Sequence, residues 1–171
     1  PDATFMRMKD DHLQNGQLKP AYNVQLGTEN QFILGFSIHQ RPDDSTCLIH
    51  HLEHVKNAQL GKLPQNIIAD AGYGSEENYE YLVRHGLGNY VKYNTFHLER
   101  TRKFKNDPFR VENLLYDECK DEYICPAGKR MRHVKVKRTR TINGYLTEQA
   151  IYECEDCSGC LLKEKCTKSK G

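Results

Sequence analysis

The sequence predicts an α/β fold with a mixed sheet, followed by a smaller β-rich region that contains cysteines. Between residues 21 and 93, short β-type runs alternate with stretches of helical periodicity. Residues 129–140 are basic and alternate as in a strand, and residues 154–166 hold closely spaced cysteines. We therefore expect two domains: an α/β core in residues 1–106 and a basic, β-rich insertion in residues 107–171.

The first predicted elements are a hairpin and a helix. Two β-type runs, residues 21–27 and 31–38, flank a tight turn to which Gly27 and Asn30 are suited. A helix of about three turns follows, because apolar residues fall at helical spacing: Leu48, Ile49, Leu52 and Val55. The residues available as its N-cap are Asp44 and Ser45.

The next predicted elements are a strand, a second helix and a strand. Residues 66–70 form a short apolar run, and residues 75–86 predict a helix with Ser75 as its N-cap. Residues 89–93 predict the last strand of this region. A strand that leaves through a helix and returns usually pairs in parallel, so we expect a mixed sheet.

Composition limits the class of protein. With 171 residues, 28% charged side chains and a mean hydropathy of −0.79, the chain has no apolar run long enough for a transmembrane helix or a signal peptide. We expect a cytoplasmic protein with no membrane partner. Residues 1–91 carry 7 basic and 11 acidic side chains, and residues 92–140 carry 14 and 7. The first and last residues do not resemble natural termini, so we expect a fragment of a longer protein.

Asp70 ends a strand and is followed closely by Gly72 and Gly74. Reactive groups in open α/β sheets collect at the carboxyl ends of strands. The two glycines allow the chain to leave the sheet sharply beside the acid. The alternative interpretation is that Asp70 only caps the turn.

The residues around Asp70 also carry a family resemblance. The stretch IIADAGYGSEENYEYL (67–82) closely resembles the signature around the second catalytic aspartate of bacterial insertion-sequence DDE transposases, whose catalytic core is ribonuclease-H-like. The resemblance continues backwards through PDATFMRMKDD and KPAYNVQLGTENQFILGFSIHQRPDDSTCL. It continues forwards through NYVKYNTFHLER, YICPAG and CEDCSGCLLKEKC, and so covers essentially the whole chain.

This resemblance implies phosphoryl transfer on DNA by two Mg²⁺ or Mn²⁺ ions held by three carboxylates, of which Asp70 is one. The partners implied are DNA, as terminal inverted repeats and target, and further copies of the protein in a homo-oligomer. The first acid of such cores lies in an opening strand whose motif is not found here. The third, a helical glutamate, is expected beyond Gly171. The chain alone is therefore expected to be inactive.

The remaining acids have simpler interpretations. By the family pattern, Asp2 belongs to a segment after the opening strand. The glutamates of the second helix, Glu76, Glu77 and Glu80, form a helix start and a solvated face. For the acids before the first helix, an N-cap explains Asp44 and solvent exposure explains Asp43.

Four of the seven cysteines predict a zinc site: Cys154, Cys157, Cys160 and Cys166. A segment with no core of its own gains order from such a metal. Iron–sulfur ligation is the competing assignment, and free thiols are a third. Cys125 is a candidate to displace one of the four, Cys119 is a weaker one, and Cys47 is expected to be a small buried hydrophobe.

The basic run predicts contact with the DNA backbone, since rows of cations neutralise phosphates without reading bases. The residues concerned are Lys129, Arg130, Arg132, Lys135, Lys137, Arg138 and Arg140, together with Lys92 after the last strand of the core. The alternative is a solvated edge strand protected by its charge. For the whole chain, the alternative to a transposase fragment is a non-catalytic, zinc-dependent DNA-binding module or a decayed element product.

Overall fold

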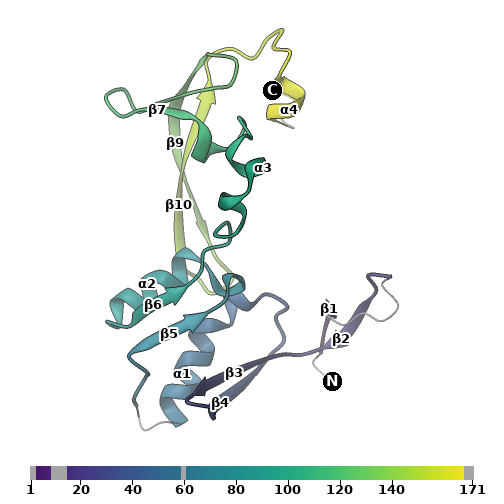
Figure 1. Cartoon of the computed structure of the whole chain (residues 1–171), viewed down its shortest axis with the longest axis vertical. Helices are drawn as coiled ribbons and strands as arrows, with labels where there is room; N and C mark the ends of the chain where they lie inside the picture. Colours follow the sequence, from purple (N-terminus) through teal and green to yellow (C-terminus); the bar gives the residue numbers. More distant parts are fainter. Residues whose placement is uncertain (1–2, 9–14, 59–60, 168–171) are drawn as a thin grey trace. The chain divides into compact units, whose positions relative to one another are not determined.

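The computed structural model describes residues 3–8, 15–58 and 61–167 (Figure 1). The chain divides into two compact units, Pro1–Phe96 (unit 1) and His97–Gly171 (unit 2). This division falls before the boundary expected at residues 106 and 107, so the predicted domain limits stay a prediction. Helices and strands are mixed along the chain, as an α/β protein requires.

Unit 1 has the predicted order of strand, strand, helix, strand, helix and strand, preceded by one more hairpin. Its strands are β1 (Thr4–Arg7), β2 (Leu18–Ala21), β3 (Asn23–Glu29), β4 (Phe32–His39), β5 (Asn66–Ala69) and β6 (Gly88–Val91). Its helices are α1 (Leu48–Ala58) and α2 (Glu76–Arg84), with 3₁₀ turns η1 (Asp44–Thr46) and η2 (Ala71–Tyr73).

The β3–β4 hairpin turns at Asn30 and Gln31, whose φ angles are 48° and 72°. Two left-handed residues give a turn that matches the twist of the strands. Gly27, expected in this turn, instead lies inside β3 opposite Gly35. A Cβ on Gly27 would lie 3.1 Å from Nε2 of His51, so this glycine allows α1 to pack closely on the hairpin.

Strands β5 and β6 pair in parallel through α2, as predicted. Ser75 caps α2 by accepting a hydrogen bond from the Asn78 amide at 3.2 Å. The core lies between these elements and α1, and it consists of Leu48, Leu52, Ile67, Leu82 and Val91. Both helices are therefore held through the same apolar cluster as the parallel pair.

The single mixed sheet expected from the sequence is not formed among the described strands. The β3–β4 and β5–β6 pairs are separate two-stranded sheets. One face of each pair carries the side chains that α1 and α2 cover, and the other face leaves large apolar side chains exposed: Val24, Leu26, Phe36, Ile38, Ile68 and Tyr90. Each of these two small sheets in unit 1 thus has one apolar face that no helix covers.

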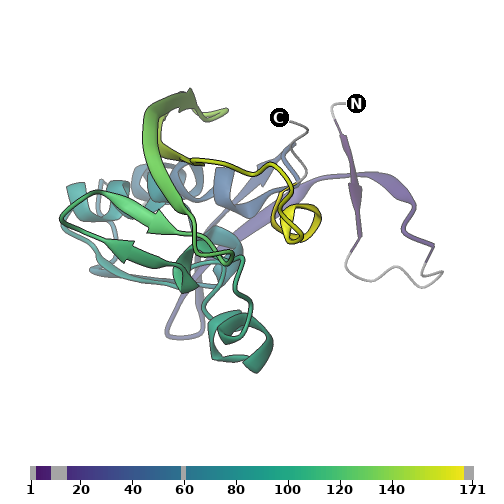
Figure 2. The same ribbon diagram turned by 90° about the horizontal axis from the view of Figure 1, so that it is seen from above.

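Unit 2 is built on an antiparallel sheet in the order β10, β9, β8 and β7. Its strands are β7 (Leu115–Asp117), β8 (Glu122–Ile124), β9 (Arg130–Arg140) and β10 (Leu146–Cys154), and its helical segments are η3 (Leu98–Arg100), α3 (Arg102–Lys105), η4 (Val111–Asn113) and α4 (Lys163–Cys166). A bulge between Ile151 and Tyr152 accompanies the curvature of the β9–β10 ribbon (Figure 2). None of the helices in the described parts has the length and apolar character needed to cross a bilayer.

Candidate functional site

Asp70 lies directly after β5, at the carboxyl end of a strand held in the core. Its side chain is exposed, and Oδ1 accepts a hydrogen bond from the Gly72 amide at 2.8 Å. Asp70 is therefore the N-cap of η2. This hydrogen bond does not use Oδ2, so the carboxylate can cap the turn and still offer an oxygen to a ligand.

The two glycines after Asp70 are required by close contacts, not by backbone conformation. A Cβ on Gly72 would lie 3.0 Å from Asp70 Oδ1 and 3.4 Å from Asp44 Oδ2. A Cβ on Gly74 would lie 2.6 Å from the carbonyl oxygen of Lys92. Gly72 thus leaves open the space beside two carboxylates, and Gly74 allows η2 to approach the end of β6.

Asp44 is the second carboxylate at this place, and its role differs from the predicted helix cap. The cap of η1 is Asp43, whose Oδ1 accepts from the Ser45 amide at 3.0 Å. Asp44 Oδ1 instead accepts hydrogen bonds from Asn23 Nδ2 at 2.7 Å and Gln25 Nε2 at 3.0 Å. The interpretation of Asp44 as an N-cap was wrong because the chain enters the 3₁₀ turn one residue earlier.

Tyr73 connects this network to η2. Its hydroxyl donates to Gln25 Oε1, and Gln25 itself is only 2% exposed. Burial raises the pKa of Tyr73 to about 12, and the charges of Asp44 and Asp70 act in the same direction. The Tyr73 hydroxyl therefore stays protonated and donates a hydrogen bond to the buried Gln25 amide. This bond fixes η2 relative to β3.

Asn78 fixes the same turns from the side of α2. Its Nδ2 donates to the carbonyl oxygens of Ser45 at 2.8 Å and Tyr73 at 2.7 Å. The side chain is fully buried. Because one amide bridges η1 and η2, the segments that carry Asp44 and Asp70 are held together by α2.

The chemistry of these donors fits a hard divalent cation in kind, since carboxylate oxygens are the ligands that Mg²⁺ prefers. Asp70 and Asp44 supply two such groups beside Gly72. Within residues 3–8, 15–58 and 61–167, however, no three His, Cys, Asp or Glu side chains form a group that could hold a metal ion. A complete three-carboxylate centre would need further acids.

The other sequence candidates lie as follows. Asp2 falls outside the described residues. Glu76 and Glu77 occupy the first turn of α2, and Glu80 forms an ion pair with Arg84. Lys92 follows β6 with Nζ 5.8 Å from the centre of the Phe96 ring.

A cavity of about 650 Å³ lies beside β3 and β5. Each strand lines it with consecutive residues, 25–29 from β3 and 66–69 from β5. Side chains alternate between the faces of a strand, so an uninterrupted run shows that strand edges border the cavity. From α1 it is lined by four residues at helical spacing: Leu48, His51, Leu52 and Val55. The cavity is a slot with two strand edges as walls and a helix beside it.

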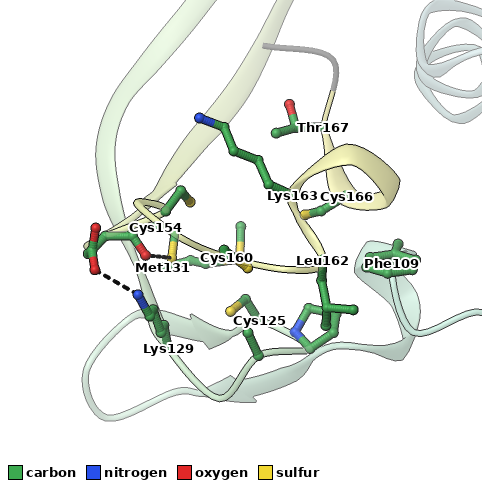
Figure 3. Close-up of a pocket in the computed structure, with 14 residues that line it drawn as sticks. Phe109, Cys125, Lys129, Met131, Cys154, Cys160, Leu162, Lys163, Cys166 and Thr167 are labelled. Atoms are coloured by element: carbon green, nitrogen blue, oxygen red, sulfur yellow. Dashed lines mark hydrogen bonds and ion pairs between the residues drawn. The ribbon is translucent and has the colours of Figure 1, made fainter. Parts of the chain in front are cut away.

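In unit 2, five cysteines line a cavity of about 50 Å³: Cys125, Cys154, Cys157, Cys160 and Cys166 (Figure 3). All five are free thiols. Cys119 is exposed and does not line the cavity, whereas Cys47 in unit 1 is fully buried, as expected. The spacing of the last four cysteines predicted their proximity, and the β8–β9 turn adds Cys125.

Two contacts hold the β8–β9 turn against the segment that follows β10. Lys129 Nζ lies 2.7 Å from Asp156 Oδ2, and the Glu155 amide donates to the carbonyl oxygen of Arg130 at 3.0 Å. The ion pair with Lys129 is the main reason why the pKa of Asp156 lies below its usual range. The arrangement brings together cysteines that are about thirty residues apart in the sequence.

The basic run forms β9, which is exposed along most of its length and pairs with β8 and β10. Where β9 pairs with both β8 and β10, it is therefore not an edge strand. Four of its cations form ion pairs: Lys129 with Asp156, Arg130 and Arg132 with Glu122, and Arg138 with Glu148. Arg140 donates to the carbonyl oxygen of Gly144. Among the described residues, Lys135 and Lys137 have no carboxylate partner.

Comparison with known families identifies part of unit 2. Residues 124–171 match the model of a family described as a transposase DDE domain. This segment is therefore similar to a transposase DDE domain. This confirms the predicted resemblance to DDE transposases. The chain matches none of the curated proteins and none of the solved structures with which it was compared.

The matched segment, residues 124–171, contains β9, β10, α4 and all five cavity cysteines. Asp70 and its network precede it. Sequence reasoning missed Asn23, Gln25 and Tyr73, because the spacing of polar residues in β3 does not tell which of them faces η1. The polar residues Asn23 and Gln25, which alternate with the apolar Val24 and Leu26, were the available signal.

Proposed function

We propose that the chain forms part of the catalytic core of a DDE transposase that cuts and joins DNA at insertion-sequence ends. In this proposal Asp70 is one of three carboxylates that hold two Mg²⁺ or Mn²⁺ ions, which would activate the attacking oxygen and stabilise the leaving one. The observation that carries the proposal is the position of Asp70, exposed at the carboxyl end of a parallel strand with Asp44 across Gly72.

We propose further that the core is ribonuclease-H-like and that another strand completes it. The slot between β3 and β5 supports this, because a strand placed there would find an unpaired edge on either side. It would join the hairpin and the parallel pair into one mixed sheet. An aspartate at the end of that strand nearest Asp70 would be the first acid of the family pattern.

The residues of this chain would then hold and orient the carboxylates of Asp70 and Asp44. The remaining acids would come from elsewhere in the transposase. The Gly72 amide fixes Asp70 Oδ1. The bonds of Asp44 to Asn23 and Gln25 keep a second charge at the same opening. Since one of three acids cannot bind two ions tightly, we expect the chain alone not to cut DNA.

DNA is the proposed partner of the exposed basic strand β9. Cations engaged with protein carboxylates contribute less to phosphate binding than unpaired ones, so Lys135 and Lys137 are the strongest candidates for contacts to the backbone. Lys92, whose carbonyl oxygen lies beside Gly74 at the end of β6, is the proposed contact to a phosphate near the Asp70 turn. In the complete protein we propose a homo-oligomer that acts on paired DNA ends.

Zinc is the proposed occupant of the cysteine cavity. Thiolates suit Zn²⁺, and a short segment with few apolar contacts gains order from such an ion. The five thiols around one small cavity support this proposal over an iron–sulfur cluster, which needs room for inorganic sulfide as well.

One observation favours the alternative, a non-catalytic zinc-dependent DNA-binding module. The family match covers residues 124–171, which hold the cysteines and the basic strand but not Asp70. Substitution of Asp70 in the full-length transposase separates the two. Loss of cleavage of terminal-repeat DNA with retained DNA binding supports the catalytic proposal, and unchanged cleavage refutes it.

A further inference from the structure

The β9–β10 ribbon has two faces of different chemistry. We infer that one of them, the lysine face, lies in the major groove of duplex DNA, and that Gln149 on this face contacts a base edge. The residues of the lysine face are Lys135, Lys137, Thr139, Thr147, Gln149 and Ile151. This inference rests on the DNA partner proposed above for β9, and it adds which side of the ribbon meets the DNA and which residue reads sequence.

The register of the two strands determines which side chains share a face. Beyond the bulge, three alternate pairs lie on the lysine face: Lys135 with Ile151, Lys137 with Gln149, and Thr139 with Thr147. The hydroxyls of Thr139 and Thr147 are 2.8 Å apart, as side chains on one face should be. The pairs between them project to the opposite face, where Arg138 forms an ion pair with Glu148 at 2.6 Å. Side-chain contacts therefore agree with the register on both faces.

The two faces differ in unneutralised charge. Lys135 and Lys137 are exposed, and their side chains form no ion pair or hydrogen bond with the described residues. The six residues of the lysine face include no acid. Of the two arginines on the opposite face, Arg138 is paired with Glu148, and Arg140 donates to a backbone carbonyl oxygen. Unpaired cations on one face favour the approach of a polyanion such as DNA to that face.

The shape of the ribbon fits a groove. Strand β8 pairs with β9 at residues 130–132, so beyond this point β9 and β10 form a sheet of two strands (Figure 1). The major groove of B-DNA is about 12 Å wide and admits a two-stranded ribbon. Residues 134–140 span about 20 Å at about 3.3 Å per residue, which corresponds to about six base pairs. The lysine face is therefore narrow enough to enter the groove and long enough to follow it.

Gln149 is the amide at the centre of the lysine face. It is exposed opposite Lys137, and its side chain has no hydrogen-bond partner among the described residues. A glutamine amide both donates and accepts, and in the major groove it pairs with the N6 and N7 atoms of adenine. Phosphate contacts position a protein without reading sequence, and base contacts specify it. Lys135 and Lys137 thus hold the ribbon on the backbone, and Gln149 contacts the base.

The first experiment places the same negative charge on either side of the ribbon. Gln149→Glu and Ala150→Glu change neighbouring exposed residues of β10 that project to opposite faces. Fluorescence anisotropy measures the affinity of the whole chain for a short labelled duplex of mixed sequence. Gln149→Glu should weaken binding at least about tenfold, and Ala150→Glu less than about twofold. An equal effect of the two substitutions, or a larger one for Ala150→Glu, would overturn the assignment of the lysine face. Circular dichroism of each variant establishes that the ribbon is formed.

The second experiment tests the base contact with Gln149→Ala. Duplexes with a randomised window are selected by the parent chain and by the variant, and then sequenced. The parent should enrich adenine at one position, and Gln149→Ala should lose this preference while keeping the salt dependence of binding, because no charge is removed. A preference that Gln149→Ala retains, or a parent with no preference, would refute the base contact.

These outcomes are distinct from failure of the proposed function. If the parent chain binds duplex DNA without the expected difference between the faces, the inference fails and the DNA partner stands. If the parent does not bind duplex DNA at low salt, the DNA partner proposed for β9 fails together with the inference. Neither result bears on cleavage by Asp70, which is measured separately.

Discussion

Gln25 donates a hydrogen bond from Nε2 to Asp44 Oδ1 at 3.0 Å, and it does so while almost completely buried. The same Nε2 also donates to Asn23 Oδ1 at 2.8 Å, and the opposite end of the amide accepts from Tyr73. A carboxylate on η1, an amide on β3 and a phenol on η2 thus form one network. The positions of the two acids beside Gly72 depend on it.

Replacing Asp44 with alanine should destabilise unit 1 by about 1–3 kcal/mol, because the amide donors of Asn23 and Gln25 lose a charged acceptor in a buried place. The measurement is urea unfolding of the chain followed by circular dichroism. Asp43→Asn is the matched control and should cost less than about 0.5 kcal/mol, since asparagine caps as well as aspartate. Equal stability of Asp44→Ala and the parent would contradict the network.

The slot between β3 and β5 predicts that backbone amide hydrogens of these strands exchange at different rates in the isolated chain and in the longer protein. In the isolated chain, amides of β3 and β5 that point away from their partner strands should exchange rapidly. In the longer transposase proposed above, an inserted strand should slow them at least about tenfold. Hydrogen exchange by mass spectrometry on peptides covering residues 24–29 and 66–69 measures this. Peptides from β9 and β10 serve as the internal control, and equal exchange of the slot peptides in both proteins would speak against an inserted strand.

Lys137 and Arg138 are neighbours on β9 that differ in whether a carboxylate neutralises them. Arg138 forms an ion pair with Glu148 at 2.6 Å, and Lys137 has no carboxylate partner among the described residues. Lys137→Ala should lower the slope of log affinity for duplex DNA against log salt by about 1, and Arg138→Ala should lower it less. Fluorescence anisotropy at several salt concentrations measures both slopes. A slope unchanged by Lys137→Ala would exclude this lysine from the DNA interface.

The buried histidine of α1 predicts a loss of stability in mild acid. Burial lowers the pKa of His51, and the neighbouring His39 and His54 act in the same direction. The unfolded chain therefore binds protons more readily than the folded one, so the melting temperature should be constant above pH ~6.5 and fall as the pH decreases below it. Differential scanning fluorimetry from pH 7.5 to 5 should show a smaller fall for His51→Gln than for the parent.

The exposed His85 provides the control for this prediction. His85→Gln should retain the pH dependence of the parent, because this side chain lies exposed at the C-cap of α2 and not among the buried residues of α1. If His51→Gln and the parent lose stability in parallel through this range, another group causes the acid sensitivity.

Local sequence signals predicted strands β3 to β6, helices α1 and α2 and the place of Asp70, but not the β1–β2 hairpin of unit 1. Helical spacing predicted α1, Ser75 predicted the start of α2, and a strand–helix–strand order predicted the parallel pair. The position of Gly27 was wrong because its role is a tertiary contact with His51, which periodicity does not reveal. Asp44 was misassigned for a similar reason: a cap one residue earlier satisfied the turn, and its true partners lie in a distant strand.

Cysteine spacing likewise predicted a cluster but could not decide its membership. Cys125 is far from Cys157 in the sequence, and only the pairing of β8, β9 and β10 brings them to one cavity. The basic run predicted an exposed strand, yet not which of its cations are already paired with carboxylates. In each case the sequence predicted the chemistry of the local residues but not which distant residues they contact.

The most direct test of the catalytic proposal compares Asp70→Asn with Asp43→Asn in the proposed full-length transposase. Both aspartates cap a 3₁₀ turn through Oδ1, and asparagine preserves that hydrogen bond while removing the charge. Cleavage of terminal-repeat DNA in Mg²⁺ should fall by at least about a hundredfold for Asp70→Asn and be unchanged for Asp43→Asn, with equal DNA binding. Full activity of Asp70→Asn would show that Asp70 only caps its turn and would contradict the catalytic assignment.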